Sequence, residues 1–333
     1  CGIVAGSHEG PLYADMDIII KSGYVARVVN GHMGNEKNFT FKYNGTNYRF
    51  PDNTYSGRAN ILIDPRDGAG NIDNSKVIIT ELYGGSTGRG YLSNTTIKNP
   101  FYGYSTVTIN GGTFTILPEN NPKKNMIFSG VFGSGAGGYN GIGDDANPTV
   151  DEHIAYWSPD NKVVLYGPYK DAKDRLVSVK CYNANDPANP YTMVDPAKTN
   201  TNIVIEGGIF GSEDQPIDGI YAGGSGFMSP SLFYDRGVVP SKYGGNIYGK
   251  AGETVSTLTI TGGTFYCDHG IFAGGRGTDK FYAEDPYAGN PADYTELGKT
   301  YGNVVLNING GTMYCNVYGG GAGVAEALLK NTD

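Results

Sequence analysis

The sequence of 333 residues has few charged side chains, a single tryptophan, few cysteines and no long apolar run. Charged residues make up 17% of it, against about 25% in an ordinary globular protein. No cluster of Lys and Arg stands out, so we expect no nucleic-acid partner. No run approaches the ~18 apolar residues of a membrane-spanning helix, so we expect no membrane span. The 4 cysteines are too few for a disulfide scaffold, and none is spaced as CxxC, which excludes a zinc ribbon.

Glycine and tyrosine are what the chain has in excess. It contains 52 glycines and 26 tyrosines, and its net charge is −8. The glycine content is roughly twice ordinary usage. Many Gly, Tyr, Thr and Asn residues with few charges predict an all-β chain rather than a helical one.

An eight-residue pattern recurs along the chain. It joins an alternating aliphatic and polar segment to a Gly-Gly pair and a short apolar end. Two glycines permit a positive φ and a close approach of backbones, so each copy predicts a short strand followed by a tight corner. The copies are VTINGGTF at 107–114, IVIEGGIF at 203–210, LTITGGTF at 258–265, LNINGGTM at 306–313 and a degenerate IIIKSGYV at 18–25.

A second pattern follows each copy of the first. It consists of an aliphatic residue, an aromatic residue and two small residues, at 82–85, 131–134, 220–223, 271–274 and 317–320, with weaker copies at 3–6 and 28–31. A unit of about 20 residues cannot bury its own apolar face, whereas stacked units can. We therefore expect an all-β, single-stranded parallel β-helix of about six to seven coils. Equivalent side chains should then form two columns: Phe114, Phe210, Phe265 and Met313 in one, and Tyr83, Phe132, Tyr221, Phe272 and Tyr318 in the other.

The copies are unevenly spaced, so surplus residues should leave the β-helix as insertions. We expect one domain, 1–333, with main insertions at 35–60, 139–202, 227–256 and 278–302. The β-prone segments 162–166 and 176–181 predict a hairpin within 139–202, which would form a small side lobe.

These motifs resemble the Gly-rich parallel β-helix repeats of microbial cell-surface proteins, either adhesin-like or forming envelopes and sheaths. The resemblance is carried by the T-x-I-x-G-G-T-F and V-Y-G-G-G patterns, and it covers most of the predicted coils but none of the insertions. It implies a right-handed coil, an extracellular or cell-envelope location and, in many members, no known catalytic site.

One Gly-rich loop gathers several oxygen ligands. Asp64, Asp67, Asn71 and Asp73 could hold Ca²⁺ there, although their spacing does not match that of an EF-hand loop. A solvated turn is the alternative interpretation. We expect no cofactor apart from this Ca²⁺.

A polysaccharide lyase or hydrolase is the least favoured class. Asp144 and Asp145 after Gly143 resemble part of a polygalacturonase-type motif, but the companion motifs of that family are missing. Acidic residues in a loop rich in Gly and Asn are typical of turns. We therefore assign no catalytic residue and expect that the protein is not an enzyme.

Aromatic side chains in the predicted insertions lie beside Asn and Asp, a combination suited to stacking on sugars. The alternative is that these rings pin the loops to the β-helix. The candidate glycan contacts are Tyr139, Trp157, Tyr282, Tyr287 and Tyr294.

Two cysteines occupy equivalent positions in the repeat. Cys267 and Cys315 each lie five residues after the first glycine of their doublets. Neighbouring coils would hold them at the strand spacing of about 5 Å, which permits a disulfide or a column of buried thiols. Cys1 is expected in the same column.

Self-association is the favoured partner interaction. Residues 1–10 fall in a coil corner, and the helix-prone segment 324–330 is too short to cover a coil. We expect open coil ends to pair head to tail or in an array. The favoured function is a non-enzymatic structural subunit of a sheath, surface layer or fibre, and the alternative is a surface adhesin or glycan-binding β-helix.

Overall fold

Parallel strands dominate the part of the chain that this computed structural model describes. Within that part the only helix is a 3₁₀ turn, η1 (Asn74–Lys76), so the prediction of an all-β chain is confirmed. The described residues are 2–6, 12–13, 15–31, 40–43, 45–49, 55–85, 101–118, 129–135, 140–141, 153–157, 163–166, 180–181, 192–193, 200–225, 243–244, 247–248, 252–277 and 296–322.

One sheet, here called sheet B, has ten described strands that all pair in parallel. Its long strands lie side by side in the order β3-β7-β9-β17-β22-β27, which is also their order in the chain. The strands of sheet B are β2 (Leu12–Tyr13), β3 (Met16–Ile20), β7 (Tyr55–Ile63), β9 (Phe101–Ile109), β12 (Asn140–Gly141), β17 (Asn200–Ile205), β21 (Ile247–Tyr248), β22 (Thr254–Ile260), β26 (Thr300–Tyr301) and β27 (Asn303–Ile308).

A second parallel sheet, sheet A, has eleven described strands. Strand β8 pairs with β4 on one side, and on the other side it pairs with β10 along its first half and with β11 along its second half. The strands of sheet A are β1 (Gly2–Val4), β4 (Gly23–Val29), β8 (Val77–Tyr83), β10 (Thr113–Phe114), β11 (Gly130–Phe132), β18 (Ile209–Phe210), β19 (Ile217–Tyr221), β23 (Thr264–Phe265), β24 (Cys267–Phe272), β28 (Thr312–Met313) and β29 (Val317–Tyr318).

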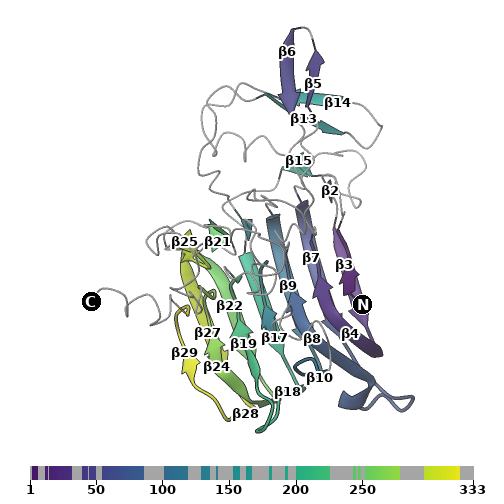
Figure 1. The fold of residues 1–333 in the computed structure, drawn as a ribbon, viewed down its shortest axis with the longest axis vertical. Helices are drawn as coiled ribbons and strands as arrows, with labels where there is room; N and C mark the ends of the chain where they lie inside the picture. The colour runs from purple at the N-terminus through teal and green to yellow at the C-terminus, as the bar shows by residue number, and fades with distance from the viewer. Residues whose placement is uncertain are drawn as a thin grey trace.

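The chain passes alternately through the two sheets. It leaves β3 for β4, returns to β7, leaves again for β8, and repeats this path as far as β27, β28 and β29. Each passage places its strands beside those of the passage before it, so the colours from purple to yellow follow one another across the molecule (Figure 1). Below, one passage through sheet B and then sheet A is called a coil.

The hydrophobic core lies between the two sheets. Alternate residues of a strand point to opposite faces, and in sheet B the aliphatic set points inward while residues such as Asn60 and Thr106 point outward. One inward row is formed by a single aliphatic residue from each coil, and strand register places its members directly beside one another: Ile20, Ile63, Ile109, Ile205 and Ile260.

The two predicted side-chain columns are confirmed. In the core, the ring of Phe210 stacks between those of Phe114 and Phe265, with centroids 4.6 and 4.7 Å apart, and Met313 follows in register. The second column packs on the opposite face of sheet A as a separate buried cluster. Its rings Tyr83, Phe132, Tyr221, Phe272 and Tyr318 stack at successive centroid distances of 4.8, 5.2, 5.0 and 4.6 Å.

In each Gly-Gly corner one glycine adopts a positive φ and the other permits a close approach of two backbones. The second glycine of each doublet has a positive φ, for example 118° at Gly208 and 104° at Gly263, a conformation that other residues rarely adopt. The first glycine allows a close approach, because a Cβ on Gly262 would lie 2.2 Å from the carbonyl oxygen of Glu206 in the preceding coil.

The predicted hairpin within 139–202 involves residues outside the described part of the chain, because only 180–181 of the segment 176–181 are described. Strand β14 (Val163–Tyr166) pairs antiparallel with β13 (His153–Trp157). Strand β15 (Lys180–Cys181), at the end of the segment 176–181, pairs with β16 (Thr192–Met193). Both segments are β-prone, but pattern alone does not specify which of several short strands will pair.

Two insertions that are separate in the sequence meet in one sheet. The antiparallel pair β5 (Thr40–Tyr43) and β6 (Thr46–Arg49) extends the pair β13 and β14, because β13 lies parallel to β6. The resulting four-stranded sheet, in the order β14-β13-β6-β5, lies beyond one end of sheets A and B (Figure 1). Two further short strands, β20 (Tyr243–Gly244) and β25 (Glu296–Leu297), pair with each other.

All the predicted insertions fall at the same connection of the coil, where the chain leaves sheet A and returns to sheet B. The insertion at 35–60 lies between β4 and β7, that at 139–202 between β11 and β17, and those at 227–256 and 278–302 before β22 and β27. Some strands of sheet B begin inside the expected limits of the insertions, since β7 already starts at Tyr55. The division into one domain with a side lobe stays a prediction.

The core column of rings gives a direct test of the packing. Phe210→Ala removes two stacked ring contacts and leaves a cavity, so we expect a loss of about 3–5 kcal/mol in the free energy of unfolding. Ile209→Ala, at the half-exposed neighbouring position, should cost less than about 1 kcal/mol. Urea denaturation followed by circular dichroism measures both values, and equal losses would contradict the buried column.

Candidate functional site

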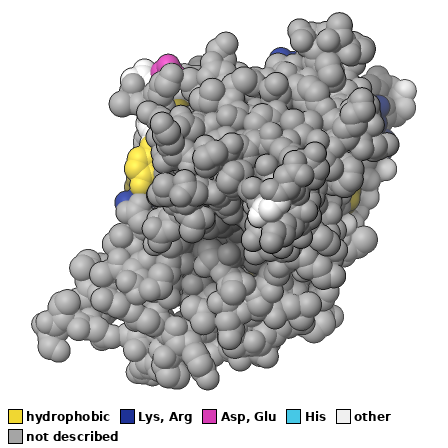
Figure 2. Space-filling model, turned by 90° about the horizontal axis from the view of Figure 1, so that it is seen from above, with side chains coloured by type: hydrophobic (Ala, Val, Ile, Leu, Met, Phe, Trp, Pro, Cys, Tyr) yellow, Lys and Arg dark blue, Asp and Glu magenta, His cyan; other side chains and the backbone are white. Residues whose placement is uncertain are grey.

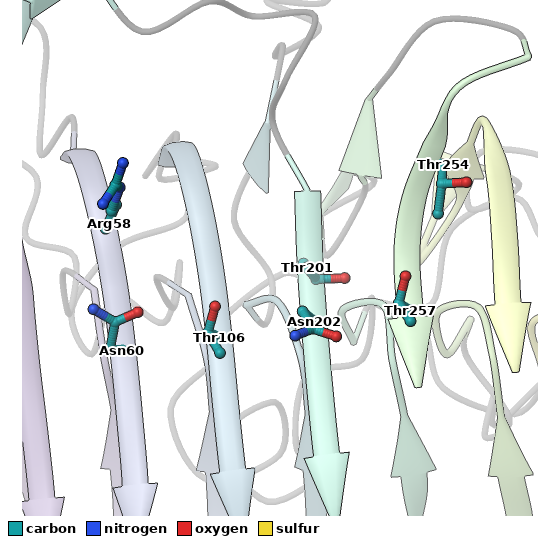
Figure 3. A pocket seen from close by; sticks show the side chains of 7 residues that line it. All are labelled: Arg58, Asn60, Thr106, Thr201, Asn202, Thr254 and Thr257. Atoms are coloured by element: carbon teal, nitrogen blue, oxygen red, sulfur yellow. The ribbon is translucent and has the colours of Figure 1, made fainter. Parts of the chain in front are cut away.

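A polar groove crosses the outward face of sheet B. The side chains of Asn60, Thr106, Asn202 and Thr257 lie in one row across four neighbouring strands (Figure 3), because strand register sets each residue beside the next. Arg58, Thr201 and Thr254, from the first halves of β7, β17 and β22, also line the groove, and its volume is about 540 Å³.

The described lining of the groove offers hydrogen-bonding groups. Its seven described lining residues carry hydroxyl, amide and guanidinium groups, and none of them is a carboxylate, an imidazole or a thiol. Such groups donate and accept hydrogen bonds without exchanging protons near neutral pH. The described lining is therefore suited to binding a polar ligand through hydrogen bonds.

A buried charged cluster occupies the outer face of sheet A. Arg276 Nη2 lies 2.8 Å from Asp218 Oδ1, and His269 Nδ1 lies 3.2 Å from the same oxygen. The Tyr221 hydroxyl donates to Asp218 Oδ2 at 3.1 Å, and burial raises the pKa of that hydroxyl. The Asp218 carboxylate thus ties together residues of two neighbouring coils.

Sequence reasoning missed this cluster, although a signal was present. Strands β19 and β24 are aligned at Ile217 with Cys267 and again at Gly219 with Gly270. Between these two pairs β19 has one residue, Asp218, whereas β24 has two, Asp268 and His269, so the register shifts there. These residues interrupt the repeat, and an irregular spacing between otherwise regular columns marks such a position.

A second ion pair lies on the same sheet three coils earlier. Arg27 and Glu81 are register partners on β4 and β8, and Arg27 Nε lies 2.5 Å from Glu81 Oε2. The Tyr83 hydroxyl also donates to Glu81. Glu81 is fully buried, and a buried carboxylate requires a partner of this kind. Both ion pairs thus join neighbouring coils and accept a hydrogen bond from the tyrosine column.

In the predicted calcium loop the carboxylates accept hydrogen bonds from protein groups, most of them within the loop itself. Asp67 accepts bonds from the amides of Ala69 and Asn71, and the Asn71 amide is the main cause that lowers the pKa of the Asp67 carboxyl. Asp73 caps η1 and accepts bonds from Ser75, which lower its pKa, and Asp64 accepts from Arg66 and Asn110. Among the described residues, no group of three His, Cys, Asp or Glu side chains is placed to hold a metal ion.

Most of the other predicted site residues lie outside the described part of the chain. This applies to Cys1, to Asp144 and Asp145, and to the helix-prone segment 324–330. Of the candidate glycan contacts, Trp157 ends strand β13, but its side chain is not among those described. The remaining four, which also lie outside the described residues, are Tyr139, Tyr282, Tyr287 and Tyr294.

Cys267 and Cys315 are free thiols that face each other on neighbouring coils. The preceding residues, Tyr266 and Tyr314, stack their rings at 4.5 Å, and Phe265 and Met313 are register partners before them. Cys267 is buried in the core, whereas Cys315 is partly exposed. The structure therefore brings together two of the three predicted column members, and a disulfide between them stays a prediction.

The two thiols share a hydrogen bond that gives them different pKa values. Cys267 keeps the shared proton and is buried, and both effects raise its pKa. The same hydrogen bond stabilises a thiolate on Cys315 and lowers the pKa of Cys315 to about 7. The first proton of the pair therefore leaves from the more exposed sulfur.

Comparison of the chain with protein-family models, with curated proteins and with solved structures gives no match. Among the described residues, no helix has the length and apolar character required to cross a membrane. Functional proposals therefore rest on the groove, the thiol pair and the sheet edges.

The acidity of Cys315 can be measured by alkylation. In a background with Cys1→Ser and Cys181→Ser, the rate of reaction with iodoacetamide should reach half its maximum near pH 7. Adding Cys267→Ala removes the donor, so the midpoint should move toward the ordinary thiol value of about 8.5. Identical midpoints in the two proteins would show that the thiols do not interact.

Proposed function

We propose that the chain is a single-stranded parallel β-helix. Its alternating path through sheets B and A supports this, as do the columns that pass through successive coils and the Gly-Gly corners at equivalent positions. The right-handed sense of the coil stays a prediction from the resemblance of the repeat.

We further propose that this β-helix is a non-enzymatic structural subunit of a microbial cell surface or envelope, such as a sheath, surface layer or fibre. The surface location rests on the resemblance of the repeat. The assembly itself is supported by one observation, an edge at which the core columns end in contact with solvent.

This edge is formed by β27, β28 and β29, here called the edge coil. Ile308 is 45% exposed, although its register partner Ile260 is fully buried, and Val317 is 36% exposed beside a fully buried Ile271. In the view from above, described hydrophobic side chains reach the surface on the side where β27 and β29 lie (Figure 2). An exposed parallel edge with aligned apolar columns is a template for a further coil.

The opposite edge of the stack carries residues of the same columns, although Ile18 and Ile20 there are only 7% and 5% exposed. Ile3 packs against the core, and Val4 packs against the aromatic column on the other face of sheet A. The edge strand β3 places Ile18 and Ile20 in the inward rows. Because both edges carry the same columns, the first coil of one copy matches the edge coil of another. Such a head-to-tail contact repeats without closing and produces a filament.

A charge on the edge coil tests this assembly. Ile308→Lys places an ammonium group on the proposed contact, so it should abolish filaments seen by electron microscopy and leave monomers in sedimentation. Because the side chain is already exposed, the unfolding free energy should change by less than about 1 kcal/mol. The matched control is Ile209→Lys, which is 39% exposed in the middle of the stack and should leave assembly intact. Filaments of unchanged length with Ile308→Lys would contradict the proposal.

Glycan binding is a second candidate function, and the groove on sheet B favours it. Its row of amide and hydroxyl groups repeats once per strand, and sugar hydroxyls pair with groups that both donate and accept hydrogen bonds. The ligand would lie across the strands, along the direction in which the coils follow one another.

Substitutions in the groove separate this function from assembly. Asn202→Ala removes one amide from the row, and the loss of a hydrogen bond of about 1 kcal/mol should weaken binding roughly three- to tenfold. Asn307→Ala, on the same face but outside the groove, is the matched control. Affinity electrophoresis against a panel of neutral and acidic polysaccharides measures both, and equal mobilities of the two variants on every polysaccharide would contradict glycan binding in the groove.

A further inference from the structure

The thiol pair lies at the junction between the edge coil and the rest of the stack. Cys267 begins β24, and Cys315 lies between β28 and β29 of the edge coil. Strands β28 and β29 have two residues each, and among the described strands they pair only with β23 and β24. In sheet A the edge coil is therefore held on one side by two short strands, whereas its longer strand β27 pairs with β22 over six residues.

The spacing of the two cysteines suits a covalent bond. Neighbouring parallel strands place equivalent Cα atoms about 4.8 Å apart, within the window of about 4.4–6.8 Å that disulfides require. The register of Phe265 with Met313 and the stacking of Tyr266 on Tyr314 fix this alignment up to the cysteines. The thiols are already in contact through their shared hydrogen bond.

We propose that Cys267 and Cys315 form a redox clamp, in which a low-molecular-weight disulfide oxidises the two thiols to one disulfide that fastens the edge coil to the stack. Cys315 is the attacking thiol because it is partly exposed, and Cys267 is the resolving thiol because it is buried beside it. The clamp does not depend on the proposed assembly, since it acts within one chain.

The reaction proceeds in two exchange steps. The Cys315 thiolate attacks one sulfur of the small disulfide, forms a mixed disulfide and releases one small thiolate. The Cys267 thiolate then attacks Cys315 Sγ, forms the Cys267–Cys315 bond and releases the second small thiolate. The two protein thiols lose two electrons and two protons in total, and both protons end on the released small thiols.

The chemistry is tested with oxidised glutathione on the folded chain carrying Cys1→Ser and Cys181→Ser. After incubation and trapping with N-ethylmaleimide, intact mass should show the loss of two hydrogens with neither glutathione nor maleimide attached. With Cys267→Ala added, one glutathionyl group should remain on Cys315, because no thiol resolves it. With Cys315→Ala added instead, the buried Cys267 should stay unmodified by glutathione at least tenfold longer.

Three outcomes would overturn the assignment of roles. The first is a pair that still takes two maleimides after oxidation and denaturation. The second is a Cys267→Ala chain that takes up no glutathione. The third is a Cys315→Ala chain that is glutathionylated as fast as the Cys267→Ala chain. Far-UV circular dichroism identifies any variant that fails to fold, and for such a variant serine replaces alanine.

The clamping effect has its own measurement. In hydrogen exchange, amides of β27, β28 and β29 should exchange at least tenfold more slowly in the oxidised chain than in the reduced chain. Amides of β7 and β9, on the far side of the stack, should keep their rates. Unchanged protection of the edge coil after disulfide formation would show that the disulfide does not stabilise this coil.

Discussion

The structure depends on one distance, the spacing of about 4.8 Å between neighbouring parallel strands. Equivalent side chains of successive coils must meet at this distance, and flat rings do so face to face, as Tyr83 and Phe132 do with centroids 4.8 Å apart. The same constraint dictates where side chains are excluded. A Cβ on Gly219 would lie 2.7 Å from the carbonyl oxygen of Gly270 and 2.9 Å from the ring of Tyr221. The glycines that precede the aromatic column are therefore part of the column, since they provide the space that its rings occupy.

Buried charged residues lie in the first coils of the repeat or at positions where the repeat is interrupted. Glu81 stands on β8 at the position where the following coils have glycine, in register with Gly130. Asp218 and His269 lie where β19 and β24 fall out of register with each other. A carboxylate cannot be repeated every 4.8 Å without self-repulsion, so each one is placed singly and is neutralised by an arginine from a neighbouring coil.

The parts of the fold that repeat could be predicted from the sequence, and the parts that occur once could not. Phe114, Phe210 and Phe265 follow identical Gly-Gly pairs, so their alignment in the sequence already specifies their alignment in space. The partner of Val163–Tyr166 in β14 is not specified in this way, because 139–202 contains several β-prone segments and no repeat that sets their register. The groove was missed because Asn60, Thr106 and Asn202 occupy the outward positions, where the repeat tolerates many polar residues. The thiol pair was expected because its members share one offset in the repeat, but the difference in their acidity depends on unequal burial, which sequence spacing does not encode.

The direction of the backbone hydrogen bonds has a mechanical consequence. The bonds of sheets A and B join one coil to the next, and even the corners continue them, as where Gly84 donates to Phe132, Gly133 to Tyr221 and Ala222 to Phe272. Tension along the stack therefore acts on every coil interface in series, and the interface with the weakest bonds should open first. A pull along the strands loads all bonds of a strand together in shear and meets far greater resistance. A body built in this way is tough across its width and weak along its length, so it withstands force best when it is anchored by its flank.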